Sequence, residues 1–500
     1  MKKIHNYIQG AVAPSSSKRV SPVYNPATGE QIAEVVLSTD ADLQKAVDAA
    51  KAALPAWMSM SPLKRSRLMN RLLYLLEQNA GELASIISEE HGKVHSDALG
   101  EVTRGIEVVE FACGAPHLLK GEFTENIATN IDSHSVRQPL GIVAGVTPFN
   151  FPAMVPMWMF PVALACGNAF ILKPSERDPS ASLFYADLIK QAGFPDGVFS
   201  VIQGDKNSVD AILKHPDISA ISFVGSTPIA KYIYETGAHY GKRVQALGGA
   251  KNHMIVMPDA DMDKTVDALM GAAYGSAGER CMAISVVVPV GEATAETLRK
   301  KLVERLATLK IGPGTDNQAE MGPLVTATHL EKVAGYINAG VSEGAELVVD
   351  GRDFKMQQAG FENGFYIGGT FFDHVSRDMS IYKEEIFGPV LCMIRAESFD
   401  DAVRMINEHE FGNGTAIFTR DGDSARSFAN QIQVGMVGIN VPIPVPMAFH
   451  SFGGWKASLF GDHHMHGPEG VRFYTKLKTI TSRWPTGIRS GADFVMPTME

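Results

Sequence analysis

From residue 141 onward, short apolar runs alternate with amphipathic stretches, and this alternation restricts the possible folds more than any other feature of the chain. The first five runs read GIVAGVTPF, NAFILKPSE, GVFSVIQG, ISAISFVGS and KRVQALGG. Helical periodicity lies between them at 180–191, 208–214 and 227–240. Strands that alternate with helices predict a parallel sheet with helices on both faces, which is a doubly wound α/β domain.

A second series of the same kind begins after residue 249. It contains the runs HMIVMPDA and SVVVPVG, with helices predicted at 263–274 and 295–309. Before both series, apolar residues at helical spacing predict two long helices at 40–54 and 61–91, the second capped by Ser61. We therefore expect an α/β protein with two doubly wound parallel-sheet domains.

Two segments, 122–139 and 472–483, have a partly alternating, Thr- and Val-rich pattern and belong to neither series. We expect them to be strands that leave the body of the subunit. Exposed strand edges are satisfied by pairing with another chain, so these segments predict association between copies of the chain. The prolines at 442, 444 and 446 indicate an ordered loop or a hinge.

Charge and composition exclude several classes of protein. With 45 Lys and Arg against 55 Asp and Glu, the net charge of −10 gives no cationic excess for nucleic acid. No segment reaches the ~18 uninterrupted apolar residues of a membrane span, and the first residues lack the apolar core of a secretory signal. We expect a cytoplasmic protein without membrane contact.

Four cysteines are spread along the chain at 113, 166, 281 and 392, with no spacing typical of metal ligands, so no metal site is predicted. Cys281 differs from the others because it follows Gly275-Ser276-Ala277-Gly278-Glu279-Arg280. The glycines allow the backbone to approach a ligand, and the neighbouring guanidinium favours a thiolate. Local chemistry alone leaves open whether Cys281 is a nucleophile or a buried filler.

Polar residues follow three of the predicted strands, at the edge where open α/β sheets bind ligands. Asn150 offers an amide to a developing oxyanion, although the local sequence favours a turn-forming Asn between prolines. Lys173 and Glu176 suit ribose hydroxyls, although a solvated ion pair is the simpler interpretation. At Ser226 a strand meets a helix N-terminus, which favours a phosphate but also describes an ordinary capped helix.

Taken together and in this order, these segments closely resemble the aldehyde dehydrogenase superfamily over nearly the whole chain. The segments that carry the resemblance are Pro148-Phe149-Asn150-Phe151-Pro152, Lys173-Pro174-Ser175-Glu176, Phe223-Val224-Gly225-Ser226-Thr227, Glu279-Arg280-Cys281, Glu384-Glu385-Ile386-Phe387-Gly388-Pro389 and Ser451-Phe452-Gly453-Gly454-Trp455-Lys456. The resemblance implies a Rossmann-like NAD-binding domain over 1–121 and 139–249. It also implies a catalytic domain over 250–447 and a β oligomerisation arm over 122–138 and 470–490, in a homotetramer built as a dimer of dimers.

The resemblance also assigns the site. It implies that Cys281 is the nucleophile and that Asn150, with the backbone N–H of Cys281, forms the oxyanion hole. NAD is the implied cofactor, and its groove is lined by Thr147, Phe149, Lys173, Glu176, Arg177, Ser226, Gly248, Glu385 and Phe387. Glu176 is expected to repel a 2′-phosphate and so to favour NAD over NADP.

Hydrolytic members of the superfamily carry a glutamate base in a Glu-Leu-Gly-Gly-Lys segment, whereas this chain reads Gln245-Ala246-Leu247-Gly248-Gly249-Ala250-Lys251. Loss of a general base lowers the rate of attack by water by ~10²–10⁴-fold. Coenzyme A, whose thiol needs no such base, is therefore the expected acyl acceptor. This segment and the run at 275–282 resemble the CoA-acylating branch, the methylmalonate-semialdehyde dehydrogenases. That branch oxidises methylmalonate or malonate semialdehyde to propionyl-CoA or acetyl-CoA with loss of CO₂.

Such a substrate brings a carboxylate into the site, and burying it requires a fixed cation. Arg280 adjoins the nucleophile that the resemblance implies, and Arg104 matches the second arginine of that branch. Periodicity alone favours a pair of Arg104 with Glu101 or Glu107 on its own helix face, so its functional assignment depends on the resemblance. The alternatives are a hydrolytic aldehyde dehydrogenase that uses Glu385 as its base, a cysteine acyltransferase or thioesterase without a redox cofactor, and a purely structural role. The preferred semialdehyde is left open.

Overall fold

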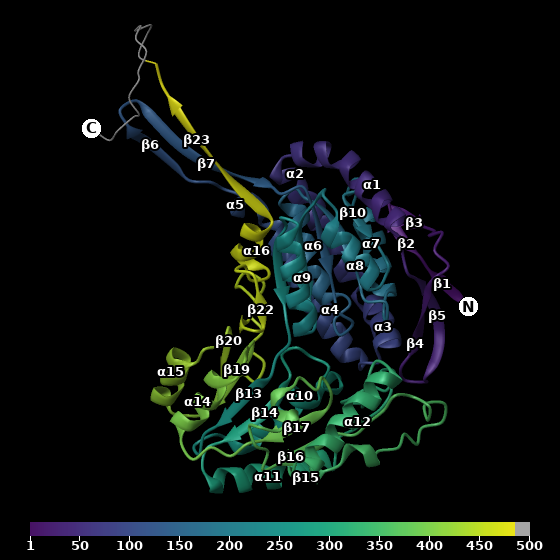
Figure 1. The fold of residues 1–500 in the computed structure, drawn as a ribbon, viewed down its shortest axis with the longest axis vertical. Helices are drawn as coiled ribbons and strands as arrows, with labels where there is room; N and C mark the ends of the chain where they lie inside the picture. Colours follow the sequence, from purple (N-terminus) through teal and green to yellow (C-terminus); the bar gives the residue numbers. More distant parts are fainter. Residues whose placement is uncertain (486–500) are drawn as a thin grey trace.

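The computed structural model describes residues 1–485, which form two stacked α/β bodies and a projecting β arm (Figure 1). The first body is built on an eight-stranded sheet. Its strands, in spatial order, are β22 (Leu459–Phe460), β12 (Arg243–Leu247), β11 (Ile218–Val224), β8 (Ile142–Val146), β9 (Ala169–Lys173), β10 (Phe199–Val201), β2 (Asn6–Ile8) and β3 (Ala11–Ala13). The five strands from β12 to β10 are parallel, and all five were predicted.

Helices cover both faces of this sheet, which confirms the doubly wound prediction. One face carries α2 (Pro62–Gln78), α3 (Ala80–His91), α4 (His95–Cys113), α6 (Met154–Ala165) and α7 (Ser180–Gln191). The other carries α1 (Asp40–Ser59), α8 (Lys206–Lys214) and α9 (Thr227–His239). Helix α6 is buried along its whole length because α4 packs closely against it.

The helix predicted at 61–91 is wrong as a single element, because the chain forms α2 and α3 with a break at Asn79. Asn79 has φ −113° and ψ 12°, and its side-chain amide donates to the carbonyl of Leu75 at 2.7 Å, which ends α2. The predicted cap is confirmed, since the hydroxyl of Ser61 accepts a hydrogen bond from the N–H of Lys64.

The second body contains a seven-stranded sheet. Its strands, in spatial order, are β15 (Glu346–Val349), β16 (Thr370–Asp373), β17 (Val390–Met393), β14 (Ile284–Pro289), β13 (Asn252–Val256), β19 (Gly414–Phe418) and β20 (Met436–Ile439). All neighbours are parallel except β15 and β16. The covering helices are α10 (Met262–Tyr274), α11 (Glu292–Leu306), α12 (Ala327–Ser342), α14 (Phe399–Glu408) and α15 (Gly422–Gln431).

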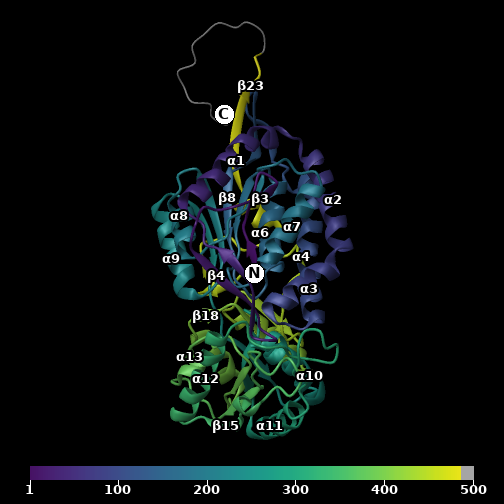
Figure 2. The same ribbon diagram turned by 90° about the vertical axis from the view of Figure 1, so that its right-hand side faces the viewer.

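The arm consists of β6 (Phe123–Ala128), β7 (Ile131–Pro139) and β23 (Thr475–Arg483), and it projects beyond the body in both views (Figures 1 and 2). Strand β23 pairs with β7 in antiparallel register, from Thr475 opposite Pro139 to Arg483 opposite Ile131. The expected arm segment 470–490 differs in two respects. Residues 470–473 belong to α16 (Gly467–Phe473), whose Phe473 is buried in the body, and 486–490 lie outside the described residues.

Two short sheets complete the described chain: β1 (Lys2–Ile4), β5 (Glu30–Val36) and β4 (Val20–Asn25) in one, β18 (Phe411–Gly412) and β21 (Trp455–Lys456) in the other. Within residues 1–485, every helix is too short or too polar to be a candidate for crossing a bilayer.

Candidate active site

A tight turn presents Cys281 between α10 and β14. Ser276 and Ala277 have φ values of 52° and 50°, and Gly278 has 73°, so three successive residues lie in the left-handed region. A Cβ atom at Gly278 would lie 2.2 Å from the carbonyl oxygen of Gly388, so only glycine fits there. The turn brings the cysteine beside the loop that carries Glu385 and Phe387.

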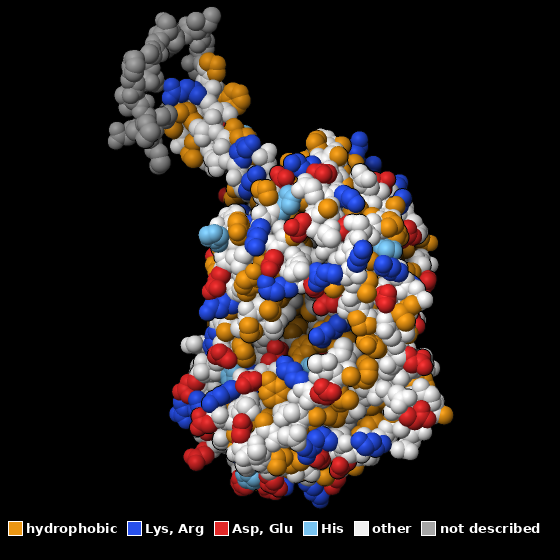
Figure 3. Space-filling view, turned by 45° about the vertical axis from the view of Figure 1, so that its right-hand side comes forward, with side chains coloured by type: hydrophobic (Ala, Val, Ile, Leu, Met, Phe, Trp, Pro, Cys, Tyr) orange, Lys and Arg blue, Asp and Glu red, His pale blue; other side chains and the backbone are white. Residues whose placement is uncertain are grey.

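Cys281, Arg280, Glu385 and Phe387 line one pocket that opens to solvent. One face of the molecule is hollowed between the two bodies, with apolar side chains inside the hollow and charged side chains near its rim (Figure 3). The backbone N–H of Ala250 donates to Glu385 Oε1 at 3.1 Å, and burial raises the pKa of Glu385 to about 7. A titratable carboxyl group therefore shares the pocket with the thiol.

The Cys281 thiol is neutral in this arrangement. Burial, with a smaller contribution from the nearby Glu385, raises its pKa to about 12. The backbone N–H groups of Cys281 and Met282 and the guanidinium of Arg280 act in the opposite direction but do not outweigh burial. Arg280 lowers the pKa of Cys281, as expected, but this effect is smaller than the effect of burial.

Arg280 is already paired in the structure. Its guanidinium lies 2.6 Å from Asp97 Oδ1 on α4 and donates to the carbonyl of Gly271 at 3.3 Å. Although burial raises the pKa of Asp97, the charge of Arg280 lowers it below its ordinary value. The positive charge beside Cys281 is thus largely compensated.

Arg104 also lies on α4, but it is not among the residues that line the Cys281 pocket. Its guanidinium donates to the carbonyls of Val445 at 3.2 Å and Pro446 at 2.5 Å, and it lies 2.6 Å from Glu107 Oε2. The ion pair with Glu107, which the sequence left open, is confirmed. A role for Arg104 toward substrate stays a prediction.

Two asparagines that sequence analysis did not single out hold the backbone of Cys281. The side-chain amides of Asn252 and Asn413 both donate to the carbonyl of Cys281, at 2.9 and 3.0 Å. Asn252 also donates to the carbonyl of Ala283 at 3.0 Å and accepts from the N–H of Gly414 at 3.0 Å. A sequence signal existed, since each asparagine stands at the start of a strand in the second series.

The segment that carries Asn150 follows β8 and reaches the same region through its neighbour Phe149. The centres of the Phe149 and Phe387 rings lie 5.8 Å apart. The guanidinium of Arg177 lies over the Phe149 ring, 4.9 Å from its centre. Asn150 itself is buried, as is Thr147, whose hydroxyl has no hydrogen-bond partner. The structure therefore gathers Phe149, Arg177 and Phe387.

The other predicted groove residues lie at the carboxyl ends of neighbouring parallel strands. After β9, Lys173 Nζ lies 3.1 Å from Glu176 Oε2. Ser226 is the N-cap residue of α9 and makes no side-chain cap bond. The N–H of Gly248, after β12, donates to the carbonyl of Ser458 at 3.0 Å, and a Cβ atom there would lie 2.8 Å from the carbonyl oxygen of Ala457.

The segment from Gln245 to Lys251 contains no carboxylate, and its polar side chains are engaged. Gln245 accepts a hydrogen bond from the hydroxyl of Ser222 at 2.8 Å. The buried Lys251 donates to the carbonyls of Ile381 and Glu384 at 2.7 and 2.8 Å.

A second carboxyl group near Cys281 in the chain, that of Glu279, is directed elsewhere. It accepts from the N–H of Val325 at 3.2 Å and lies 3.7 Å from His91 and 3.6 Å from His329. Burial raises its pKa to about 8. Of the two glutamates, Glu385 is the one that lines the Cys281 pocket.

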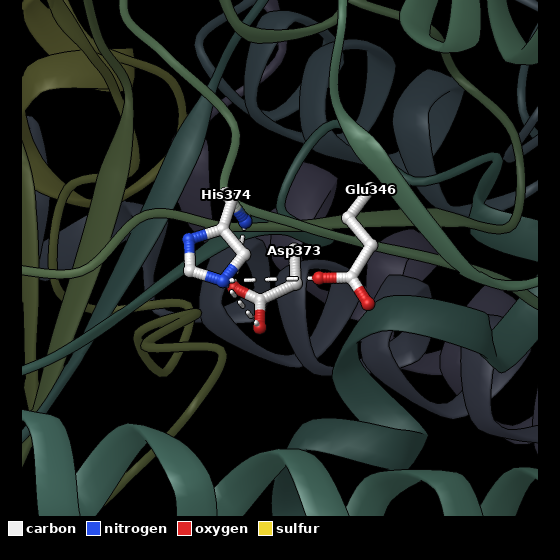
Figure 4. Close-up of side chains that lie close together, drawn as sticks. All are labelled: Glu346, Asp373 and His374. Atoms are coloured by element: carbon white, nitrogen blue, oxygen red, sulfur yellow. Dashed lines mark hydrogen bonds and ion pairs between the residues drawn. The ribbon is translucent and has the colours of Figure 1, made fainter.

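One cluster has the residue types of a metal site, namely Glu346, Asp373 and His374 at the edge of the second sheet (Figure 4). Arg299 lies 3.1 Å from Asp373 and also pairs with Glu346, and Arg395 lies 2.6 Å from Asp373. Two guanidinium groups thus compensate the two carboxylates, which describes a salt-bridge network and not a cation site.

Comparison with known proteins agrees with this geometry. The family model described as "Aldehyde dehydrogenase family" matches residues 12–480. A malonate-semialdehyde dehydrogenase of Pseudomonas aeruginosa is 59% identical over 500 residues, which cover 100% of both chains. One from Halalkalibacterium halodurans is 49% identical over 483 residues, covering 97% of this chain and 99% of that one.

Solved structures give the same result. A provisionally named methylmalonate-semialdehyde dehydrogenase of Sinorhizobium meliloti 1021, complexed with NAD, matches with a TM-score of 0.96 and 58% identity, covering 98% of this chain and 99% of that one. The methylmalonate-semialdehyde dehydrogenase of Oceanimonas doudoroffii matches with a TM-score of 0.96 and 56% identity, covering 97% and 99%. The chain belongs to the aldehyde dehydrogenase family.

Proposed function

We propose that this enzyme oxidises malonate or methylmalonate semialdehyde with NAD and transfers the acyl group to coenzyme A, with loss of CO₂. The observation that carries the proposal is the composition of the Cys281 pocket, which contains a partly buried thiol and no carboxylate from residues 245–251. The names of the relatives that are 49–59% identical support the substrate class.

Cys281 is proposed as the nucleophile and Asn150 as a donor of the oxyanion hole. Attack of the deprotonated sulfur on the aldehyde carbon forms a tetrahedral thiohemiacetal. The side-chain amide of Asn150 and the N–H of Cys281 stabilise its oxygen, an effect worth ~10²–10³-fold per donor in related chemistry. Since the thiol has a pKa of about 12, a base must take its proton, and Glu385 is the titratable group in the pocket.

The proposed NAD groove fits a dinucleotide on two counts. The buried hydroxyl of Thr147 lacks a partner, and the first turn of α9 has no side-chain cap. Lys173 and Glu176 would hold the adenosine ribose, with Arg177 and Ser226 beside the groove, while Glu385 and Phe387 would position the nicotinamide end. When bound, NAD accepts the hydride that leaves the substrate carbon.

Loss of the hydride leaves an acyl group on Cys281 as a thioester, and the acceptor decides the product. A water molecule requires a general base, whereas the thiol of coenzyme A attacks as its own thiolate. Attack at the thioester carbon forms the new carbon–sulfur bond, breaks the bond to Cys281 and returns its sulfur as the leaving group.

Arg280 and Arg104 are proposed to bind the substrate carboxylate. That carboxylate lies β to the thioester carbonyl, so its carbon–carbon bond can break with the electron pair moving into the carbonyl as an enolate. Protonation of the enolate carbon completes the loss of CO₂ and gives an acetyl or propionyl thioester. Because Asp97 and Glu107 already pair with these arginines, substrate binding competes with both carboxylates.

The decisive experiment measures NADH formation and products from malonate semialdehyde with and without coenzyme A. The expected result is slow turnover without coenzyme A and fast turnover with it, giving acetyl-CoA and CO₂ in equal amounts. Equally fast NADH formation without coenzyme A, with a free acid as product, would overturn the acyl transfer.

That second outcome corresponds to hydrolytic aldehyde dehydrogenase activity with Glu385 as the base. The position of Glu385 in the Cys281 pocket and its pKa of about 7 favour this second candidate. Glu385→Gln distinguishes the hydrolytic candidate from the CoA-acylating one. In a hydrolytic enzyme the substitution should selectively slow breakdown of the acyl-enzyme, whereas in a CoA-acylating enzyme it should not.

The assignment of domains and assembly completes the proposal. We assign NAD binding to 1–121 and 139–249, catalysis to 250–447, and assembly into a homotetramer to the arm. Exposed apolar side chains on the arm, including Phe123 and Leu477, support the last point. Light scattering of the intact enzyme tests it.

A further inference from the structure

A buried ion pair lies beneath the segment that carries Asn150. Lys93 Nζ lies 2.7 Å from Glu101 Oε2, and both side chains are 0% exposed. Lys93 stands between α3 and α4, and Glu101 lies in the second turn of α4. Taking both charges out of water is costly, and such pairs are often no more stabilising than apolar residues of the same size. Stability alone is therefore a poor explanation for the pair.

All remaining bonds of the pair reach one short segment. Lys93 Nζ donates to the backbone carbonyl of Asn150 at 2.6 Å, and it lies 4.4 Å from the ring centre of Phe151. Glu101 Oε1 accepts from the N–H groups of Ala153 and Met154, at 2.9 and 3.1 Å. The pair thus fixes the carbonyl of Asn150 on one side and the first turn of α6 on the other.

Close packing of α4 on α6 holds the pair in place. A Cβ atom at Gly105 of α4 would lie 2.6 Å from Met157 Sδ and 3.3 Å from Met154 Cα, so the two helices meet at a residue without a side chain. The backbone of Asn150, Ala153 and Met154 is therefore held by two charged side chains, one from α4 and one from the short connection that precedes it. A fixed backbone also fixes the direction of the Asn150 side chain.

We propose that Lys93 and Glu101 are positioning residues that align the Asn150 amide for the transition state. The inference rests on the proposed function, because it requires Asn150 to be an oxyanion donor. Neither residue is proposed to touch the substrate. Their effect on rate arises because a donor misplaced by about 1 Å can cost ~10²-fold.

The test uses Lys93→Met and Glu101→Gln, each alone, together, and in an Asn150→Ala background. Each single variant is expected to lower kcat by up to ~10²-fold. The KM for semialdehyde, the affinity for NAD and the alkylation rate of Cys281 are expected to stay unchanged. In the Asn150→Ala background the same substitutions are expected to cause almost no further loss, because the group they position is gone.

If a single variant fails to fold because it leaves one unpaired buried charge, the double variant Lys93→Met/Glu101→Gln replaces it in the test. This variant removes both charges at once. Glu110→Gln is the matched control, since Glu110 is an exposed acid on the same helix. Losses that multiply with Asn150→Ala, or a parallel decrease in kcat, NAD affinity and Cys281 alkylation, would overturn the positioning role. Full activity of Asn150→Ala would instead show that the oxyanion assignment in the proposed function is wrong.

Discussion

The two sides of the active site are held by different kinds of interaction. On the side of the second sheet, neutral amides of Asn252 and Asn413 hold the carbonyl of Cys281. On the side of the first sheet, a buried ion pair holds the carbonyl of Asn150. Lys93 is not among the groups that shift the pKa of Cys281, whereas Glu385 and Arg280 are. The two sides thus fix backbone carbonyls by different means, with a charged pair on one side and neutral amides on the other.

The largest effect on turnover is expected from substitution of Cys281. Cys281→Ala should abolish turnover and leave NAD binding intact, because the sulfur forms the covalent bond while the proposed groove lies mainly at the carboxyl ends of β8, β9, β11 and β12. Steady-state NADH formation and quenching of Trp fluorescence by NAD measure the two properties. Cys113→Ala, which removes another free, partly buried thiol, is the control. Retained turnover in Cys281→Ala would remove this residue from the mechanism.

The hydrogen bonds of Asn252 and Asn413 can be removed one residue at a time. Asn252→Ala removes bonds to Cys281, Ala283 and Gly414, whereas Asn413→Ala removes only one bond to a backbone group. Each buried backbone group left without a partner costs ~1–3 kcal/mol, so the free energy of unfolding should decrease more for Asn252→Ala. Urea denaturation of both variants measures this order. The reverse order would show that Asn413 is the main support of the nucleophile.

Thiol alkylation as a function of pH tests how charge acts on Cys281. With a pKa of about 12, the thiolate fraction and the rate of reaction with iodoacetamide should increase about tenfold per pH unit through neutral pH. Glu385, with a pKa of about 7, is charged above that pH and opposes the thiolate. Glu385→Gln should therefore accelerate alkylation above pH 7 and leave it unchanged below pH 6. Equal rates at high pH would contradict the electrostatic coupling.

The smallest effect is expected at the far end of the cofactor groove. Glu176→Gln removes a charge that is expected to repel the 2′-phosphate of NADP, but Glu176 is partly exposed and pairs with Lys173. Exposed charge interactions contribute ~1 kcal/mol or less, so the preference for NAD should decrease by about threefold to fivefold. The ratio of kcat/KM for the two cofactors measures it. A preference for NADP in the unchanged enzyme would contradict the assignment of Glu176.

Periodicity predicted the two sheets well, because each buried strand is a short apolar run that ends in a small or polar residue. It could not predict the break at Asn79, since apolar spacing continues across it and only the local hydrogen bond of the side chain ends α2. It also gave no indication that the C-terminal strand β23 pairs with β7, because register between distant segments is a tertiary property.

At the candidate active site, the sequence singled out residues that stand next to a recognisable turn, such as Cys281 and Asn150, whose catalytic roles stay predictions. It missed Asn252, Asn413, Lys93 and Glu101, because they act through backbone carbonyls and N–H groups that no motif encodes. Glu101 was considered only as a surface partner of Arg104, and its burial against α6 became visible only in three dimensions. The charge of Arg280 was noted, but its compensation by Asp97 requires the turn before Cys281 to meet α4, a tertiary contact.

The pairing of β23 with β7 also has a consequence for synthesis on the ribosome. Thr475 pairs with Pro139, so the hairpin of β6 and β7 emerges more than 300 residues before its third strand exists. At ~5–20 residues per second, this delay is roughly 15–70 seconds. During that time Phe123 and one strand edge are open to other nascent chains, so the arm is where we expect chaperone dependence and misassembly during expression to arise.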